Sequence, residues 1–347
     1  MNKRIRFLLF ATPVIWLVIV APLVTLASWW LSYTTLKALA WSLLAAPLVT
    51  FWIFLSFQTA NISVKWPATQ LIGLCTVLMN IVVLTAPLLF LLNAKTVAAI
   101  ATLLWVLTTC YSIWNAHNVR TTKVNITNNK LSKTYRIMHL SDLHAGSRSS
   151  RFIDRMVQQT IKQQPDIVLI TGDLIDSSAV DSNFLKPLSQ FNCPVYLCLG
   201  NHERYINLEK AISAIESNSI KILRAETVIV EELQITGIDD EDNPKQVAKV
   251  LPDIKREPSK FQILIYHRPH GFEDAAASGI DLMLCGHTHA GQMWPFGILV
   301  KRQFPYIKGL YTLNDASLYV SQGTGTWGPT MRLGTSSEMT LIEAGNT

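Results

Sequence analysis

The chain contains 347 residues, of which 49% are apolar, and its formal net charge at pH 7 is +6. The first 116 residues contain six basic and no acidic side chains, which leaves 24 of each kind in the rest. Because the whole positive excess lies in this apolar first third, the charge does not indicate a nucleic-acid partner, and we expect none. The five cysteines form no regularly spaced framework, which is typical of a reducing compartment.

Four long apolar runs fill the first third of the chain, at residues 7–31, 36–57, 69–92 and 97–116. About 20 mainly apolar residues can cross a bilayer as a helix. A cleaved signal peptide is the alternative interpretation of the first run, but that run is too long, lacks a small-x-small cleavage site and precedes three more. The sequence therefore predicts an all-α membrane domain of four transmembrane helices over residues 1–116, followed by a second domain over residues 117–347.

The basic residues beside these runs predict a topology. An even number of spans places both ends of the membrane domain on one side of the bilayer. That side would carry Lys3, Arg4, Arg6, Lys65, Arg120, Lys123, Lys130 and Lys133, against Lys37 and Lys95 opposite. By the positive-inside rule, we expect a multi-pass protein of a bacterial inner membrane whose second domain is cytoplasmic. The runs contain no acidic residue and no histidine, so we expect them to anchor the chain rather than to conduct ions.

Short apolar runs and helical patterns alternate after residue 117. The predicted strands cover residues 119–127, 135–140, 167–171, 195–199, 233–238, 262–266, 282–285, 318–321 and 339–343. One helix is predicted to begin at a Ser149 or Ser150 cap, and others cover residues 208–216 and 245–250. This alternation predicts an α/β domain.

Five of the predicted strands end in side chains that bind metals or transfer protons. In chain order these are Asp142 and His144, Asp173 and Asp176, Asn201 and His202, His267, and His287 and His289. Taken singly, "GD" after a strand is often only a turn, and the histidines of "GHTH" could be core residues with buried partners. Because strands of an α/β domain deliver their loops at the carboxyl ends, five such motifs in succession indicate one shared metal site.

The donor types indicate both the metals and the reaction. Carboxylates, imidazoles and an amide oxygen suit manganese, which is our first choice, and also iron, zinc or magnesium. Two such divalent ions about 4 Å apart can share a water, lower its pKa, and clamp the attacking and leaving oxygens of a displacement at phosphorus. Together with the family resemblance of the same motifs, this chemistry implies a phosphoric ester hydrolase that uses a metal-activated hydroxide.

The order D-x-H, GDxxD, GNHE, H and GHTH strongly resembles the calcineurin-like metallophosphoesterase family over residues 117–347. The resemblance implies a sandwich of two mixed β-sheets flanked by helices. It implies that Asp142, His144 and His289 hold one metal, that Asn201, His267 and His287 hold the other, and that Asp173 bridges them. It further implies that His202 faces the phosphoryl group, where it steadies charge or protonates the leaving oxygen. Asp176 is expected to support the turn after Asp173.

The tail "GTGTWGPTMRLGTSSEMTLIEA" and the stretch "GHTHAGQ" resemble one subgroup, the YkuE-like phosphoesterases, which includes members with several N-terminal spans. In that pattern Arg332 follows a glycine-rich turn. The alternatives for its side chain are an ion pair with Glu338 and a contact with phosphate. His270, in "HRPHG", is either a loop residue or a substrate contact.

Bulky apolar side chains follow the "GHTH" motif. Trp294 and Phe296, together with Pro295, Phe304, Pro305, Tyr306 and Tyr311, could cover acyl chains near Lys301, Arg302 and Lys308, or could fill the domain's own core. The leading hypothesis is a membrane-anchored phosphoesterase with membrane lipids as partners, which cleaves a phosphodiester or pyrophosphate bond in a lipid or lipid precursor. The alternatives are a tethered phosphodiesterase for a soluble nucleotide or small phosphodiester, and a scaffold with an inactive metal site.

Overall fold

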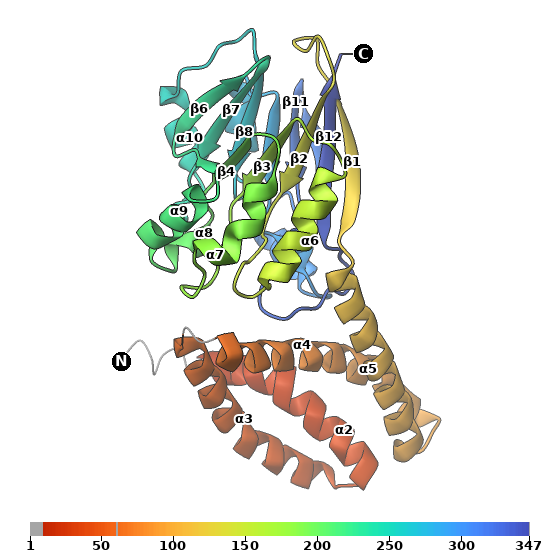
Figure 1. Cartoon of the computed structure of the whole chain (residues 1–347). Coiled ribbons are helices and arrows are strands. Elements are labelled where there is room, and N and C mark those ends of the chain that lie inside the picture. The colour runs from red at the N-terminus through yellow and green to blue at the C-terminus, as the bar shows by residue number, and fades with distance from the viewer. Residues whose placement is uncertain (1–9, 60–61, 347) are drawn as a thin grey trace. The chain divides into compact units, whose positions relative to one another are not determined.

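The computed structural model describes residues 10–59 and 62–346 (Figure 1). The chain divides into two compact units. The first comprises Met1–Trp114 and Gly328–Met331, and the second comprises Asn115–Trp327 and Arg332–Thr347. The division lies close to the boundary predicted between residues 116 and 117, whereas the sequence did not indicate that a short segment near the C-terminus groups with the first unit.

Among the described residues, four helical segments are long and apolar enough to cross a membrane, which confirms that the four predicted runs form long apolar helices. They run over Phe10–Leu31, Leu36–Gln58, Ser63–Phe90 and Ala94–His117. Their elements are the π-helical turn η1 (Trp16–Val20), α2 (Ala21–Leu31), α3 (Thr35–Gln58), α4 (Ile62–Thr85), the 3-10 turn η2 (Ala86–Phe90) and α5 (Ala94–His117). Residues 7–9 of the first predicted span, and the basic residues Lys3, Arg4 and Arg6, lie outside the described residues.

The third span begins earlier than predicted. The sequence boundary at residue 69 excluded Lys65 and Pro67, but both lie within α4. A lysine at the start of a membrane helix can extend its long side chain towards water, so it does not end the helix. Pro22 is the second residue of α2, which directly follows the π-helical turn η1.

The second unit contains two six-stranded sheets. The first has the order β1-β12-β2-β3-β4-β5. Its strands are β1 (Arg120–Thr127), β12 (Glu338–Gly345), β2 (Tyr135–Leu140), β3 (Ile167–Thr171), β4 (Val195–Cys198) and β5 (Lys221–Ile222). Strands β2 to β5 run parallel to one another, while β12 runs antiparallel to β2, so the sheet is mixed.

The second sheet has the order β10-β11-β9-β8-β7-β6. Its strands are β10 (Gly309–Leu313), β11 (Ala316–Val320), β9 (Leu282–Cys285), β8 (Phe261–Tyr266), β7 (Leu233–Ile238) and β6 (Glu226–Val230). The sequence did not predict β5, β6 or β10. All three are edge strands, and β6 and β10 are half exposed, so their apolar runs are absent or shorter than those of a strand buried on both faces.

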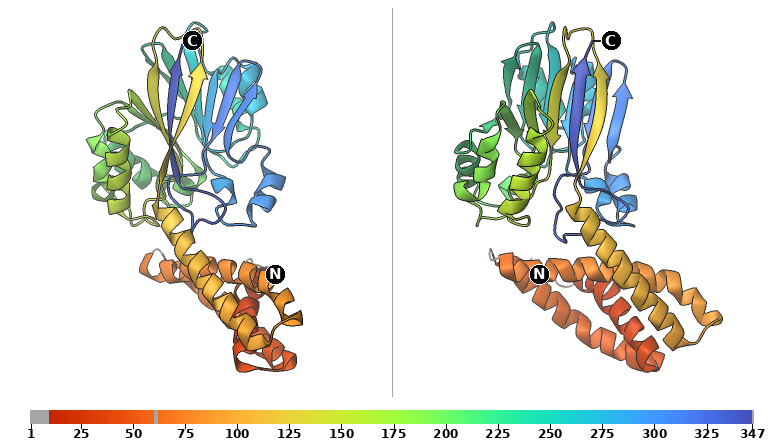
Figure 2. Two further views of the ribbon diagram at one scale, coloured as in Figure 1. Left: turned by 90° about the vertical axis from the view of Figure 1, so that its right-hand side faces the viewer. Right: turned by 45° about the vertical axis from the view of Figure 1, so that its right-hand side comes forward.

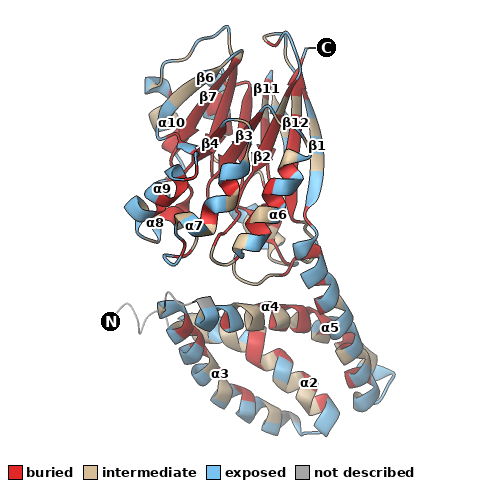
Figure 3. Cartoon of the chain, viewed as in Figure 1, coloured by how far each residue is buried: buried red, intermediate tan, exposed pale blue. Residues whose placement is uncertain are grey.

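The two sheets pack face to face, with helices on their outer surfaces (Figure 2). Alternate side chains of β3 point to opposite faces, as the pleat requires. Ile167 and Leu169 join the apolar layer between the sheets, and Val168 and Ile170 join the layer beneath the helices. Figure 3 shows that central strands such as β2 and β3 are buried, whereas the edge strands β1 and β6 carry exposed and half-buried residues. These findings confirm the predicted architecture, four apolar N-terminal helices followed by a two-sheet α/β sandwich.

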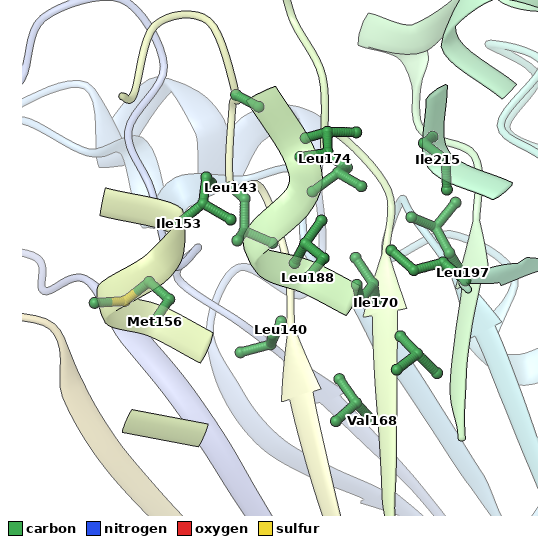
Figure 4. Close-up of a cluster of buried hydrophobic side chains, with 14 of the residues drawn as sticks. Leu140, Leu143, Ile153, Met156, Val168, Ile170, Leu174, Leu188, Leu197 and Ile215 are labelled. Carbon is green, nitrogen blue, oxygen red and sulfur yellow. The ribbon is translucent and has the colours of Figure 1, made fainter. Parts of the chain in front are cut away.

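The first sheet is covered by α6 (Ser150–Ile161), α7 (Ser182–Leu185), η3 (Lys186–Gln190) and α9 (Leu208–Glu216). Ser149 caps α6, as predicted, because its hydroxyl accepts the backbone N–H of Phe152. Side chains of α6 such as Ile153 and Met156 pack on Leu140 and Val168 of the sheet (Figure 4). On the second sheet lie α10 (Gln246–Val250), η4 (Leu251–Asp253) and α11 (Phe272–Ala277). The helices fix the strands, and the strand ends carry the candidate site.

Candidate metal centre

The nine candidate side chains follow the carboxyl ends of β2, β3, β4, β8 and β9. Strands β2, β3 and β4 are parallel neighbours in the first sheet, and β8 and β9 are parallel neighbours in the second. Their loops therefore leave the same end of the sandwich, where two short elements, α8 (Asn201–Arg204) and η5 (His289–Gly291), begin at candidate residues. The structure gathers seven of these nine side chains, all except Asp176 and Asn201, into three overlapping groups whose donor atoms lie within 4.8 Å of one another.

The first group consists of Asp142, His144 and His289. The Nε2 atoms of the two histidines lie 3.1 Å apart, and Nε2 of His289 lies 3.3 Å from Oδ1 of Asp142. All three side chains are buried. The carboxylate of Asp142 also accepts the backbone N–H of His287 at 3.1 Å and the hydroxyl of Ser141 at 2.6 Å, which holds it in place.

The second group consists of Asp173, His267 and His287. Nε2 of His267 lies 3.1 Å from Oδ2 of Asp173 and 3.1 Å from Nδ1 of His287. On the other side of its ring, Nδ1 of His267 lies 2.7 Å from the backbone carbonyl of Thr171. Donation to that carbonyl places the proton on Nδ1 and leaves Nε2 as an acceptor aimed into the group, which is how metal-binding histidines are oriented.

The third group consists of His144, Asp173 and His202, so Asp173 belongs to two groups and lies between them. Nε2 of His202 lies 3.9 Å from Oδ2 of Asp173, and the ring of His202 is 4.8 Å from that of His144. The family resemblance does not assign His202 as a metal ligand. In the structure, however, a ring nitrogen of His202 lies within 4.8 Å of the donor atoms of His144 and Asp173.

Asn201 completes the donor set. Asn201 is buried, and its side-chain oxygen Oδ1 has no hydrogen-bond partner within residues 10–59 and 62–346. A buried amide oxygen without a partner is costly, because the group has lost its hydration without compensation. A cation coordinated by Oδ1 of Asn201 would supply the missing interaction.

The charges of the site favour a cation. Burial alone lowers the pKa of His267, but the carboxylates of Asp173 and Asp142 outweigh it and raise the pKa to about 10. Burial alone raises the pKa of Asp173, but the neighbouring histidines, His267 first, outweigh it and hold the pKa well below its usual range. Positive charge is therefore stabilised at this position, as a divalent ion would require.

Three of the remaining site histidines provide neutral rings, whereas at His144 burial alone lowers the pKa but Asp176 and the nearby carboxylates outweigh it and raise the pKa. Burial lowers the pKa of His287 and of His289 well below the usual range, and it lowers the pKa of His202 to about 4. Neutral imidazole is the form that binds metals. The buried donors, their protonation and the unpaired amide oxygen of Asn201 together fit a pair of divalent ions.

The backbone is strained where the donors lie. Asp142, His144, Asp173, His287 and His289 all have positive φ, between 47° and 69°. Residues other than glycine rarely adopt this left-handed region. Such strain persists only where surrounding contacts enforce it, and it concentrates at functional sites.

The glycines of "GNHE" and "GHTH" make room for the donors. A Cβ atom on Gly200 would collide with the carboxylate of Asp173, and one on Gly286 would collide with the side chains of Ser141 and Asp142. These two motifs therefore need glycine because other strand ends approach their backbone closely.

Glu203 is a site residue that the ligand pattern did not identify, although it is the last letter of "GNHE". Its buried carboxylate accepts the backbone N–H groups of Asp173 (3.1 Å), Ile175 (2.9 Å) and Gly200 (2.9 Å). Burial first, and then repulsion by Asp173, raise the pKa of Glu203 to about 7. Glu203 thus fastens the turn after β3 to the turn after β4. The sequence signal for Glu203 was a charged residue in the motif "GNHE", which directly follows an apolar predicted strand.

Asp176 and Arg332 hold the loops around the donors. Oδ1 of Asp176 accepts the backbone N–H of Ser147 at 3.0 Å, and Oδ2 lies 3.5 Å from Nδ1 of His144. The guanidinium of Arg332 is fully buried. It donates hydrogen bonds to the carbonyls of His289, Gln322, Gly323 and Gly325.

The expected alternatives for Arg332 therefore need correction. No ion pair joins Arg332 and Glu338 in the part of the chain that the structure describes, and Glu338 instead accepts hydrogen bonds from Thr122, Tyr319 and Gln322. The two Nη atoms of Arg332 bind these four carbonyls because the glycine-rich turn folds around them, whereas its buried Nε has no hydrogen-bond partner among the described residues. Its side chain supports the turn that follows His289 and does not face open space.

The apolar residues after "GHTH" divide into two sets. Phe304 is buried and stacks on His270, with ring centroids 4.8 Å apart. The ring centroids of Phe304 and His287 lie 5.2 Å apart. Tyr306 and Tyr311 also pack within the domain. Burial of Phe304 favours the core alternative for that residue, Tyr306 and Tyr311 are half buried, and His270 lies in a loop and packs on Phe304.

Trp294 and Phe296 behave differently. Trp294 is 50% exposed and Phe296 is half buried. The helix that follows them, α12 (Gly297–Gln303), contains no buried residue, and Ile298 and Leu299 are exposed on it. Apolar surface of this kind is available to a partner.

Comparison with known proteins agrees with this geometry. Residues 135–291, which include every candidate donor, match the calcineurin-like phosphoesterase family. A metallophosphoesterase from Aquifex aeolicus is 31% identical over 68% of this chain and 96% of its own length. Phosphodiesterase YaeI from Escherichia coli is 28% identical over 60% of this chain and 82% of its own length. A transmembrane protein with metallophosphoesterase domain from Danio rerio is 32% identical over 60% of this chain and 52% of its own length.

Other curated relatives match over about 60% of their own length. The family implies divalent metal ions, which the Asp and His groups could bind, and it supports a phosphoester hydrolase. Since the match covers nearly all of the Aquifex relative, the chain belongs to the calcineurin-like metallophosphoesterase family.

Proposed function

We propose that the chain is a membrane-anchored phosphoesterase with two divalent metals, which hydrolyses a phosphodiester or pyrophosphate bond in a lipid or lipid precursor. The observation that carries the proposal is the convergence of Asp and His donors from five strands into three overlapping groups, which are linked through His144 and Asp173. A site that only stabilised the fold would need neither two adjoining groups nor an additional histidine beside them.

Seven side chains would hold the metals. Asp142, His144 and His289 would bind one, Asn201, His267 and His287 would bind the other, and Asp173 would bridge the two. Manganese is our first choice, with iron, zinc and magnesium as alternatives. When bound, the pair supplies an activated water and neutralises charge on the phosphate.

The protein's own groups position the reaction. Asp173 is fixed by two backbone contacts, since its N–H donates to Glu203 and its Oδ1 accepts the N–H of His202 at 2.9 Å. The imidazole of His202 is 16% exposed, so it reaches both the donor groups and solvent. We assign to it the N–H that steadies charge on the phosphoryl oxygens or protonates the leaving oxygen.

A lipid substrate is supported by the four candidate spans and by the exposed apolar surface of Trp294, Ile298 and Leu299. Lys301 and Arg302 lie in the last turn of the same helix, α12, where they could pair with anionic headgroups.

We place the chain in a bacterial inner membrane as a multi-pass protein with a cytoplasmic catalytic domain. We assign it to the YkuE-like subgroup on the "GHTHAGQ" and tail motifs.

Metal dependence and turnover test the proposed chemistry. The full chain in detergent would be assayed with bis(p-nitrophenyl) phosphate and Mn, Mg or Zn, and its metal content would be measured by mass spectrometry. His202→Ala should keep its metal and lose about a hundredfold or more in kcat, whereas Asp173→Ala should lose metal as well. His117→Ala, an exposed histidine at the end of α5, should match wild type. Wild-type inactivity with every metal would refute the proposed function.

The substrate source is tested separately. Hydrolysis of a lipid phosphodiester is compared with that of its short-chain analogue and of a soluble nucleotide diester. A preference for the long-chain substrate supports a lipid substrate, and equal efficiency contradicts it in favour of a soluble one. Protease accessibility of the catalytic domain in sealed vesicles tests the cytoplasmic orientation.

A further inference from the structure

Two exposed aromatic side chains flank His202. Trp327 is 58% exposed, and its ring centroid lies 6.3 Å from that of His202 at an interplanar angle of 78°. Tyr205 is 68% exposed, and its ring centroid lies 5.3 Å from that of His202. Tyr205 follows α8, while Trp327 lies in the loop between β11 and β12. Two segments far apart in sequence thus bring open aromatic surface to the same histidine.

The backbone of Trp327 is fixed although its side chain is exposed. The side-chain amide of Gln292 accepts the N–H of Trp327 at 2.9 Å and donates to its carbonyl at 2.9 Å. Gln292 is itself buried and follows the turn of His289. Earlier in the same loop, the N–H of Gly325 donates to the carbonyl of Asp142 at 2.9 Å. The loop is therefore hydrogen-bonded both to the backbone of the candidate donor Asp142 and to Gln292, which follows the turn of His289.

An exposed indole on a fixed backbone, placed beside a histidine of the site, is suited to binding part of a ligand. An aromatic side chain gives a large contact area, and a fixed backbone reduces the entropy lost when a ligand binds. A tryptophan that served only the fold would bury its ring, as the buried Phe304 on the other side of the site does.

We infer that Trp327, together with Tyr205, forms an apolar subsite that binds the leaving group of the substrate. This inference rests on the proposed function. Hydrolysis breaks the bond from phosphorus to the leaving oxygen, forms a bond from phosphorus to the oxygen of water, and transfers a proton to the leaving oxygen. With His202 at that oxygen, the carbon skeleton attached to it extends towards the aromatic rings around His202.

The test uses two diesters that share a p-nitrophenyl leaving group, bis(p-nitrophenyl) phosphate and methyl p-nitrophenyl phosphate. Trp327→Ala should lower kcat/KM about tenfold for both, mainly through KM, because one aromatic contact is removed. Trp327→Phe should keep about half of the wild-type kcat/KM, since a flat ring remains. The metal content of both variants should equal that of wild type.

Ile229→Ala is the matched control. Ile229 is an exposed apolar residue of the same domain (47% exposed), but it pairs with Gln234 at the start of β7, at the end of that strand opposite the site. Its removal should leave both kcat/KM values unchanged.

Three outcomes would overturn the inference. The first is a Trp327→Ala variant as active as Ile229→Ala, and the second is a loss confined to the bis ester, which would place the ring against the retained group. The third is a loss of kcat accompanied by loss of metal in both Trp327 variants, which would make the ring a structural support. In each case wild-type hydrolysis leaves the proposed function intact, whereas an inactive wild type refutes that function first.

Discussion

Replacing Glu203 tests whether this buried carboxylate holds the site together. Oε2 accepts the N–H groups of Asp173 and Gly200, and Oε1 accepts that of Ile175. In Glu203→Gln the amide oxygen can keep the first two, but the amide nitrogen then faces the N–H of Ile175. A lost hydrogen bond to a charged group costs about 2 kcal/mol. In Glu203→Ala all three N–H groups lose their partner, for about 5 kcal/mol.

These energies predict a graded thermal shift. At about 3 °C per kcal/mol for a domain of this size, Tm should fall by about 6 °C in Glu203→Gln and about 15 °C in Glu203→Ala. Thermal unfolding of the full chain in detergent, followed by fluorescence at one heating rate, measures both. Glu216→Gln, exposed at the end of α9, is the control and should match wild type. Equal Tm values for Glu203→Ala and the control would refute the reasoning.

Two further substitutions test the supports around the site. Arg332→Lys should lower stability by about 3 kcal/mol and reduce metal content, because one ammonium group cannot bind the four carbonyls that the guanidinium binds; unchanged Tm and metal content would contradict the assigned role. Ser149→Ala should cost about 1 kcal/mol through loss of the α6 cap and leave kcat unchanged, as measured by Tm and turnover; a fall in kcat would show that α6 matters beyond stability.

The sequence predicted the features that depend on local pattern. Long apolar runs without acidic residues marked the four spans, and buried strands such as β2, β3 and β9 were predicted with their observed bounds. The helix α9 was predicted over its observed residues 208–216. Edge strands escaped prediction because half-exposed strands such as β6 and β10 have only a short apolar run or none.

The donor residues were also visible in the sequence, because each motif combines metal-binding side chains with a strand end. Their sharing of Asp173 and the distances among them depend on parallel strands in two sheets, and only the folded chain shows them. The partners of Arg332 likewise depend on how the glycine-rich turn wraps around it.

What the sequence by itself determined is therefore the four long apolar helices, the α/β class and the candidate donors, since these follow from periodicity, composition and motif. Only the tertiary structure decided which aromatic residues are buried and which are open. Phe304 and Trp327 are both large aromatic residues. Phe304 is buried by packing against His270, whereas the hydrogen bonds of Gln292 to the backbone of Trp327 hold that residue with its ring exposed beside His202. The difference lies in contacts between distant segments, which local sequence does not encode.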